Sequence, residues 1–283
     1  MAIIKYKNVG ITAMSGCVPK KIVSNRDLGY LIPEDEIEKT IQNIGIEERR
    51  VVEDDVCASD LCYKAARQLM DDNNIAPDSI DVLLFMSQTG DYRIPATAPL
   101  LQNRLGLSKT TCCLDLSLGC SGFVFALSVA YAYASQEGVN RVLLLDGETF
   151  SKIVNKRDKV DWPLYGDGAT ATLVEKGDFE QSTFILNTDG SGADAVMIHG
   201  GGMRNPVTSQ SVDEVICEEG NVRNELQVYM DGMAVFNFAM SVVPKSVKEI
   251  AKVTETTLED IDWLVFHQAN KFMTDFFAKR LKF

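Results

Sequence analysis

Apolar and polar positions alternate along the chain with two different periods. Short apolar runs bounded by turn residues predict strands, and apolar positions spaced three or four apart predict helices. The runs at residues 82–85 (VLLF) and 142–145 (VLLL) are apolar at every position, which is typical of strands covered by helices on both faces. The pattern therefore predicts a layered α/β fold. Further strands are expected at residues 9–13, 111–115 and 169–174, and helices at residues 58–70, 96–105 and 121–134.

The chain also contains an internal repeat. Residues 79–85 (SIDVLLF) align without a gap with residues 260–266 (DIDWLVF). In each copy a turn precedes the apolar run, and an amphipathic helix precedes the turn. We therefore expect two duplicated halves, residues 1–175 and 176–283. The second half is expected to be truncated at its C-terminus, because the sequence ends at Phe283, soon after Phe266.

Composition and charge narrow the classes of function. A hydrophobic content of 46% over 283 residues predicts a folded globular protein. The formal net charge of −12 argues against binding to nucleic acid or to an anionic membrane surface. We see no apolar run long enough for a signal peptide or a membrane span, so we expect a cytoplasmic protein. The seven cysteines lack the spacing of metal ligands, so no metal site is expected.

Cys120 stands where a nucleophile could act. Residues 114–123 (LDLSLGCSGF) run from a predicted strand through small residues into a long apolar helix. A thiol at a helix N-terminus lies at the positive end of the helix dipole, which favours the reactive thiolate. A cysteine in an apolar segment is also commonly a buried small side chain. Position alone leaves both interpretations open.

The chain has two histidines, His199 and His267. A strand is expected at residues 263–266 and a helix at residues 270–282, so His267 would stand at the carboxyl end of a strand. In α/β folds ligand chemistry concentrates at such ends, and a Cys–His pair is a common arrangement for chemistry on thioesters. A lone histidine is also often structural or solvated, so this alternative stays open as well.

Five motifs taken together resemble a known family. They are residues 119–123 (GCSGF), 165–171 (YGDGATA), 200–206 (GGGMRNP), 231–236 (DGMAVF) and 267–270 (HQAN). Their order and spacing resemble the 3-oxoacyl-[acyl-carrier-protein] synthase III family (beta-ketoacyl synthase III) of the thiolase superfamily. The resemblance implies a thiolase-like, five-layered αβαβα fold of two duplicated halves, and it agrees with the repeat.

The resemblance implies an acyltransferase of lipid metabolism. An acyl group would pass from an acyl-coenzyme A primer to Cys120, and the carbanion from decarboxylated malonyl-acyl carrier protein would then attack it in a Claisen condensation. His267 would hydrogen-bond the malonyl thioester oxygen and stabilise its developing charge. No cofactor is implied beyond the coenzyme A thioester, which is a substrate. The residues implied along its pantetheine channel are Asn270, Gly200, Gly201 and Arg204.

The resemblance also implies partners. Lys271, Lys279 and Arg280 match the place where the family docks its carrier protein, although they are equally typical of the solvated face of a helix. Residues 91–97 resemble the loop with which the family closes its partner's acyl pocket. We therefore predict a homodimer.

Three departures from the family pattern matter. The family's catalytic asparagine follows the histidine at a distance that lies beyond the end of this sequence, and so does a glycine-rich segment that supplies an oxyanion-hole donor. Losing one such donor costs ~10² to 10³ in rate, so we expect condensation to be severely impaired. Lys39 and Asn43 stand where many members carry a Trp and an Arg for the adenine of coenzyme A. Acyl transfer without condensation and a non-catalytic truncated paralogue therefore remain as alternatives.

Overall fold

The computed structural model describes residues 2–217 and 220–283, which divide into two compact units. Unit 1 comprises the chain up to Lys21 together with Arg50–Thr149 and Asp167–Leu186. Unit 2 comprises Ile22–Arg49, Phe150–Gly166 and Asn187–Phe283. These units are discontinuous in sequence and do not follow the predicted boundary between residues 175 and 176. That boundary concerns the duplication, and it stays a prediction.

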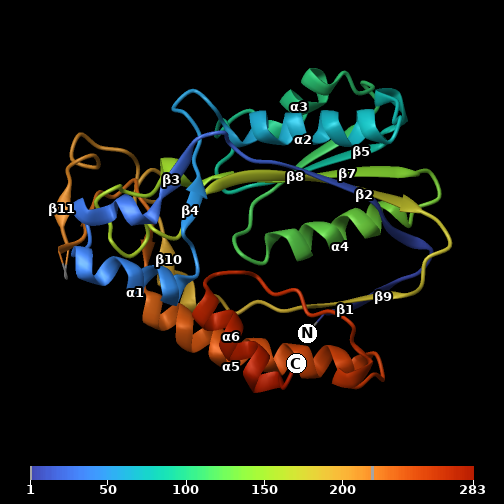
Figure 1. The fold of residues 1–283 in the computed structure, drawn as a ribbon. Helices are drawn as coiled ribbons and strands as arrows, with labels where there is room; N and C mark the ends of the chain where they lie inside the picture. The colour runs from blue at the N-terminus through green and yellow to red at the C-terminus, as the bar shows by residue number, and fades with distance from the viewer. Residues whose placement is uncertain (1, 218–219) are drawn as a thin grey trace. The chain divides into compact units, whose positions relative to one another are not determined.

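Unit 1 is built on a five-stranded sheet (Figure 1). Its strand β5 is parallel to β6 and β7, whereas β8 is antiparallel to both β7 and β2. All five strands were predicted from the sequence, to within a few residues at their ends. They are β2 (Val9–Cys17), β5 (Val82–Met86), β6 (Cys112–Leu116), β7 (Arg141–Thr149) and β8 (Asp167–Lys176), in the spatial order β2-β8-β7-β5-β6.

Helices cover both faces of this sheet. Figure 1 shows α2 (Ala58–Asp72) and α3 (Thr97–Leu105) on one face and α4 (Gly122–Ala134) on the other. Leu83 and Phe85 of β5 pack in the apolar cluster that includes α2 and α3 residues, whereas Val82 and Leu84 pack in the cluster that includes α4 residues. Every residue of β5 is buried, which explains its continuous apolar sequence. An antiparallel ribbon of β1 (Ala2–Tyr6) and β9 (Ser182–Leu186) adds to the α4 side.

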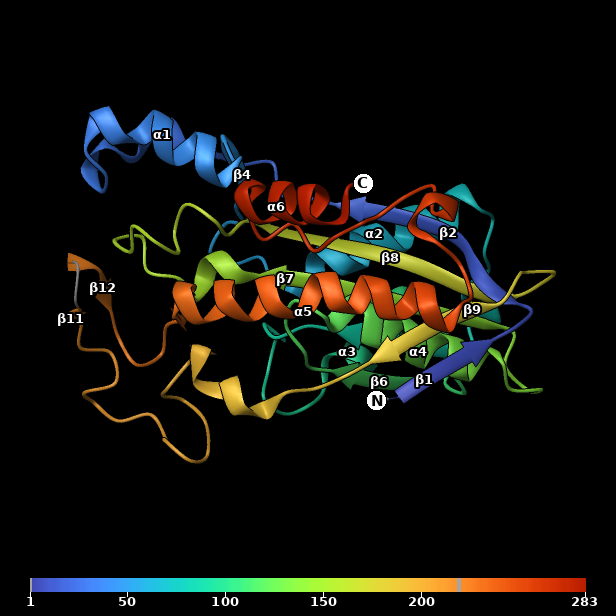
Figure 2. The same cartoon turned by 90° about the horizontal axis from the view of Figure 1, so that it is seen from below.

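Unit 2 contains two helical parts. α1 (Glu34–Ile44) and the 3-10 helix η1 (Asn25–Tyr30) enclose an apolar cluster with Trp162, which draws the segments 22–49 and 150–166 together. The other part is α5 (Gly232–Val253) and α6 (Lys271–Leu281), which lie side by side (Figure 2). Short elements complete the unit: β3 (Ile22–Ser24), β4 (Glu48–Arg50), η3 (Phe150–Lys152), η4 (Gly190–Ala195), β10 (Val196–Met197), β11 (Val215–Ile216), β12 (Val222–Arg223) and β13 (Tyr229–Met230).

The internal repeat is visible in the elements themselves. α2 ends at Asp72 and α5 at Val253, which places the two helix ends at the offset of the sequence repeat. Asn74 and Glu255, related by the same offset, both take a positive φ, 53° and 57°. The 3-10 helices η2 (Pro77–Ser79) and η6 (Leu258–Asp260) keep this offset as well. Two copies of one helix–turn–3-10 unit therefore precede residues 82 and 263.

The strand predicted at residues 263–266 is not formed. In the ranges that the structure describes, these residues have no strand partner. A strand exists only through hydrogen bonds to neighbouring strands, and the apolar pattern of the segment does not supply them. The prediction was therefore wrong for secondary structure, although the segment keeps its alternating burial. No described helix is long and apolar enough to span a membrane.

Candidate active site

Cys120 lies in the short turn that joins β6 to the N-terminus of α4 in unit 1. The turn is closed by the N–H of Gly122, which donates to the carbonyl of Gly119 at 2.7 Å. Cys120 is exposed, so the interpretation of a buried small side chain does not hold. Within the described chain, the side chain of the N-cap residue Ser121 makes no capping hydrogen bond to α4. The arrangement suits a thiolate and the oxyanion of a thioester adduct.

Gly122 allows α4 to approach the sheet closely. A Cβ on this residue would stand 2.5 Å from the terminal methyl of Met86, the last residue of β5. Because real Cβ atoms essentially never come that close, any larger residue would force the Met86 side chain or the helix to move. The glycine after Ser121 thus fixes where the N-terminus of α4 lies relative to the end of β5.

A half-buried carboxylate, Glu148, organises the strand ends next to this turn. The carboxyl ends of β5, β6 and β7 meet at one edge of the sheet, because the three strands are parallel and in register. Glu148, near the end of β7, accepts a hydrogen bond from the N–H of Gln88 at 2.6 Å and others from the hydroxyls of Ser87 and Thr89. The side-chain oxygen of Gln88 would lie 3.1 Å from a Cβ on Gly119. Glu148 therefore holds the turn that packs against the residue preceding Cys120.

Two acidic groups at this edge have raised pKa values. Burial raises the pKa of Glu148, and the hydrogen bonds from Thr89, Gln88 and Ser87 partly offset that effect. Burial, helped by the charge of Glu148, raises the pKa of Asp146 to about 6. We did not single out Glu148 from the sequence. The rule that functional polar groups gather at the carboxyl ends of parallel strands could have found it, because its strand was predicted.

His267 lies in unit 2, in the irregular segment just before α6, and it is exposed. Asn270 is the N-cap of α6, and its side-chain oxygen accepts the N–H of Met273 at 2.9 Å. This bond fixes the start of the helix shortly after the histidine. The side-chain oxygen of Asn270 is thereby engaged in the cap, so a contact with a thioester substrate would come from its amide nitrogen.

The glycine turn at residues 200–202 is tightly packed at one end. The N–H of Gly200 donates to the carbonyl of Glu225 at 2.7 Å, and a Cβ on Gly200 would lie 3.0 Å from the Cβ of Glu225. Gly201 has a φ of 88°, which favours glycine, and donates to the carbonyl of Asn205 at 2.8 Å. These contacts give the turn the close backbone packing that its glycines permit. Arg204 is exposed.

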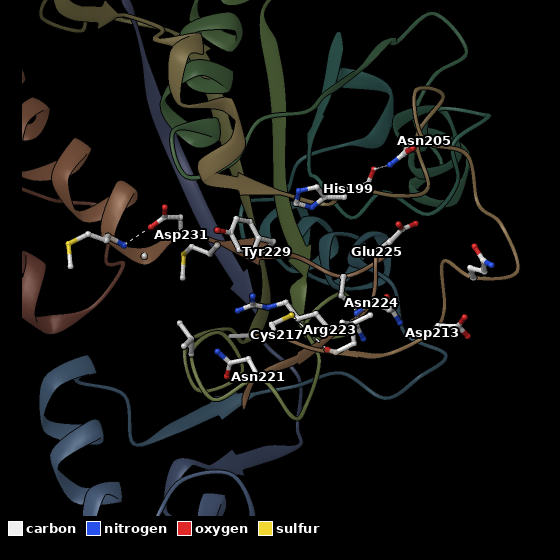
Figure 3. Close-up of a pocket in the computed structure, with 17 residues that line it drawn as sticks. His199, Asn205, Asp213, Cys217, Asn221, Arg223, Asn224, Glu225, Tyr229 and Asp231 are labelled. Carbon is white, nitrogen blue, oxygen red and sulfur yellow. Dashed lines mark hydrogen bonds between the residues drawn. The ribbon is translucent and has the colours of Figure 1, made fainter. Parts of the chain in front are cut away.

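Next to this turn lies an open hollow of about 1100 Å³ (Figure 3). Its wall includes Arg223, which is ion-paired with Asp158, lies 3.6 Å from Asp161 and sits 5.4 Å over the ring of Tyr229. Burial, with the neighbouring charge of Asp158, raises the pKa of Asp161 to about 7, and Arg223 partly offsets the rise. Since Arg223 is already paired with these carboxylates, it is poorly placed to bind an anionic ligand in the hollow.

The predicted docking residues lie on α6. Lys271 is in the first turn and pairs with Asp275, while Lys279 and Arg280 are in the last turn and exposed. Phe272 beside Lys271 is 56% exposed. Across the ranges described, no group of three or more His, Cys, Asp or Glu could hold a metal ion.

Comparison with known proteins gives the family. A family model of 3-oxoacyl-[acyl-carrier-protein] synthase III matches residues 114–192. A putative 3-oxoacyl-[acyl-carrier-protein] synthase 3 of Campylobacter jejuni is 36% identical over 84% of this chain and 67% of its own length. The beta-ketoacyl-[acyl-carrier-protein] synthase III of Caldanaerobacter subterraneus subsp. tengcongensis is 32% identical over 96% of this chain and 80% of its own length. The chain belongs to the beta-ketoacyl-[acyl-carrier-protein] synthase III family.

Solved synthase III structures agree with this assignment. One 3-oxoacyl-(acyl-carrier-protein) synthase III superimposes with a TM-score of 0.93 at 35% identity, covering 97% of this chain and 82% of the other. The synthase from Burkholderia xenovorans gives 0.91 at 33% identity, covering 99% and 79%. These matches confirm the thiolase-like α/β fold predicted from the sequence. The predicted C-terminal truncation of the second half stays a prediction.

Within this synthase III chain, some predicted site residues are brought together and others are not. His267 and Asn270 both lie just before the first residue of α6, and Gly200 and Gly201 belong to one packed turn; all four are in unit 2. Cys120 belongs to unit 1. The pairing of Cys120 with His267 therefore stays a prediction.

Proposed function

We propose that this chain is a cytoplasmic acyltransferase that accepts an acyl group on Cys120 and extends it by decarboxylative condensation with malonyl-acyl carrier protein. The observation that carries the proposal is the place of Cys120, which is exposed in the turn before the N-terminus of α4, inside the segment matched by the family model. Relatives named beta-ketoacyl-[acyl-carrier-protein] synthase III, one of them 32% identical over 96% of the chain, support the reaction class.

In the first stage the Cys120 thiolate attacks the carbonyl carbon of an acyl-coenzyme A. A carbon–sulfur bond to Cys120 forms, the bond to the coenzyme A sulfur breaks, and the departing thiolate takes up a proton. The N–H groups at the start of α4 are suited to stabilise the negative oxygen of the tetrahedral intermediate. The turn held by Glu148 keeps this helix start and the strand ends together.

In the second stage the malonyl thioester loses carbon dioxide, and the electron pair of the broken bond becomes a carbanion. His267 donates a hydrogen bond to the thioester oxygen, which carries the delocalised charge. The carbanion attacks the acyl carbon on Cys120, and the cysteine leaves as a thiolate. The product is a 3-oxoacyl thioester on the carrier protein.

Partners form part of the proposal. Lys271, Lys279 and Arg280 on α6 would receive an acidic carrier protein, while Asn270, the glycine turn and Arg204 would line the pantetheine path. The proposed homodimer would form at β6, which is an edge strand of the sheet and whose exposed residues include Cys112 and Leu114. Among the described residues no strand pairs with the outer edge of β6, and we propose that this edge pairs with a second copy.

The deciding experiment is the intact mass of the chain before and after incubation with a panel of acyl-coenzyme A thioesters. We expect one acyl mass on the native chain and none on Cys120→Ser. Cys112→Ser is the matched control, because Cys112 is also exposed, and it should keep the adduct. An adduct that survives Cys120→Ser, or that disappears in Cys112→Ser, would contradict the assignment. No adduct with any thioester would favour the non-catalytic alternative.

A second measurement separates condensation from simple acyl transfer. Acylated chain is mixed with malonyl-acyl carrier protein, and release of carbon dioxide is followed together with loss of the acyl mass. Condensation requires both. Loss of the acyl mass to an alcohol or amine acceptor without carbon dioxide would show transfer alone.

A further inference from the structure

A glutamine side chain borders the turn of Cys120 and has no hydrogen-bond partner there. Gln88 lies just beyond β5 and is exposed, and within the part of the chain that the structure describes its carboxamide makes no hydrogen bond. A Cβ on Gly119 would lie 3.1 Å from the carboxamide oxygen and 3.7 Å from the nitrogen. Residues 117–121 are exposed as well. Two N–H donors and an acceptor oxygen therefore stand ready beside the turn of the proposed nucleophile.

The backbone around Gln88 is held by several hydrogen bonds. Its N–H donates to Glu148 at 2.6 Å, and the hydroxyls of Ser87 and Thr89 donate to the same carboxylate. The Thr89 hydroxyl in turn accepts the N–H of Thr149 at 2.9 Å. These bonds leave the turn little freedom, so the side chain of Gln88 starts from a fixed point. A residue that selects a substrate needs such support from the groups around it.

The side chain of Gln88 contributes little to the fold. The bond to Glu148 comes from the backbone N–H and would survive a change of side chain. The carboxamide itself is exposed and makes no hydrogen bond among the described residues. Substitutions at such positions usually change stability only slightly. The glutamine side chain is therefore better explained by a ligand than by packing.

We infer that Gln88 is a specificity-determining residue, which contacts the acyl group on Cys120 and favours acyl groups with a hydroxyl or carbonyl close to the thioester. The inference deepens the proposed function and rests on acylation of Cys120. An alkyl chain that covers the carboxamide removes it from water and leaves its donors and acceptor without partners. A hydroxyl on the acyl chain takes the place of that water. Sites built around such a hydrogen bond reject an analogue that lacks the polar group more strongly than apolar pockets distinguish alkyl chains.

The test compares two thioesters that differ by one hydroxyl, 3-hydroxybutyryl-coenzyme A and butyryl-coenzyme A. The rate at which each acyl mass appears on the chain is followed by intact mass at subsaturating thioester, with Cys120→Ser as the blank. We expect the native chain to react at least ~10-fold faster with the hydroxylated thioester. Gln88→Met keeps the length of the side chain and removes its donors and acceptor, so it should bring the ratio of the two rates close to one.

Two further variants make the test specific. Gln181→Met is the matched control and should keep the native ratio. Gln181 is also exposed, and it follows β8, whose last residues pair with the beginning of β7, at the opposite edge of the sheet from Cys120. Gln88→Asn keeps the carboxamide on a shorter side chain and should give an intermediate ratio, which a purely structural role would not produce. Circular dichroism checks that each variant is folded.

The outcomes separate this inference from the proposed function. Acylation of the native chain at equal rates, or faster with butyryl-coenzyme A, would overturn the inference and leave the proposed acylation of Cys120 supported. A preference that survives Gln88→Met, or that is lost in Gln181→Met, would also overturn it. If Gln88→Met does not fold, an unchanged ratio in Gln88→Asn has the same meaning. No acyl mass from either thioester would contradict acylation of Cys120 and the inference with it.

Discussion

The raised pKa of Asp146 makes a quantitative prediction about stability and pH. Burial and the charge of Glu148 raise this pKa from 3.8 to about 6, so the folded state binds a proton more readily than the unfolded state. The stabilising contribution of the protonated group is therefore fully present below pH 3.8 and is lost as the pH rises through about 6. A pKa difference of one corresponds to about 1.4 kcal/mol, so ionisation of Asp146 costs the folded state ~3 kcal/mol at pH 8 and roughly half of that at pH 5.

Asp146→Asn removes the ionisation and hence this cost. The gain in unfolding free energy over the native chain should be larger at pH 8 than at pH 5 by ~1 kcal/mol, and taking this difference cancels effects of the substitution that do not depend on pH. Urea unfolding at the two pH values measures it. Asp78→Asn, at an exposed position of η2, is the control and should show a difference within about 0.5 kcal/mol. A gain for Asp146→Asn that is equal at both pH values, or larger at pH 5, would refute the argument.

Three further predictions test the core and the proposed interfaces. Leu84→Ala should lower the unfolding free energy by about 2–5 kcal/mol in urea titrations, because Leu84 is fully buried. Val265→Ala, at the exposed position that the repeat relates to Leu84, should change it by no more than about 0.5 kcal/mol. Equal losses in the two variants would contradict the difference in burial. Leu114→Lys on the edge strand should shift the chain from dimer to monomer in analytical ultracentrifugation, and an unchanged dimer would exclude this edge. Lys279→Glu should weaken binding of acyl carrier protein in titration calorimetry more than Lys245→Glu on α5, and equal effects would leave only a general charge effect.

The sequence predicted correctly the elements whose structure depends on local residues or on burial of both faces of a strand. β5 was predicted because all of its residues are apolar, and the structure shows why, since each face is covered. The turn at Cys120 was predicted for a similar reason, because small residues between an apolar strand and an apolar helix leave the chain few alternatives. The sequence repeat also corresponds to a repeat in backbone conformation, since Asn74 and Glu255 both take a positive φ.

The remaining features depend on contacts between distant residues. Glu148 acquires its role from Gln88 and its neighbours, which lie far earlier in the chain, and no local pattern announces that contact. Contacts between distant residues also explain why unit 2 is discontinuous in sequence. Arg49 donates to the carbonyl of Tyr165 and stacks over Trp162, which joins residues 22–49 to residues 150–166. The prediction of a strand at residues 263–266 was wrong because an alternating apolar pattern shows which side chains share a face. It does not show whether a neighbouring strand is present to form hydrogen bonds.

The repeat also explains why the two candidate catalytic residues occur where they do. At the offset of the repeat, His267 occupies the position equivalent to Met86, the last residue of β5. In the first copy this strand end packs against Gly122 and so fixes the helix that presents Cys120. In the second copy the same place carries an exposed imidazole, shortly before the N-cap of α6. If the proposed roles are correct, one structural position, the carboxyl end of residues 82–86 or 263–267, supports the helix of the proposed nucleophile in one copy and carries the proposed hydrogen-bond donor in the other.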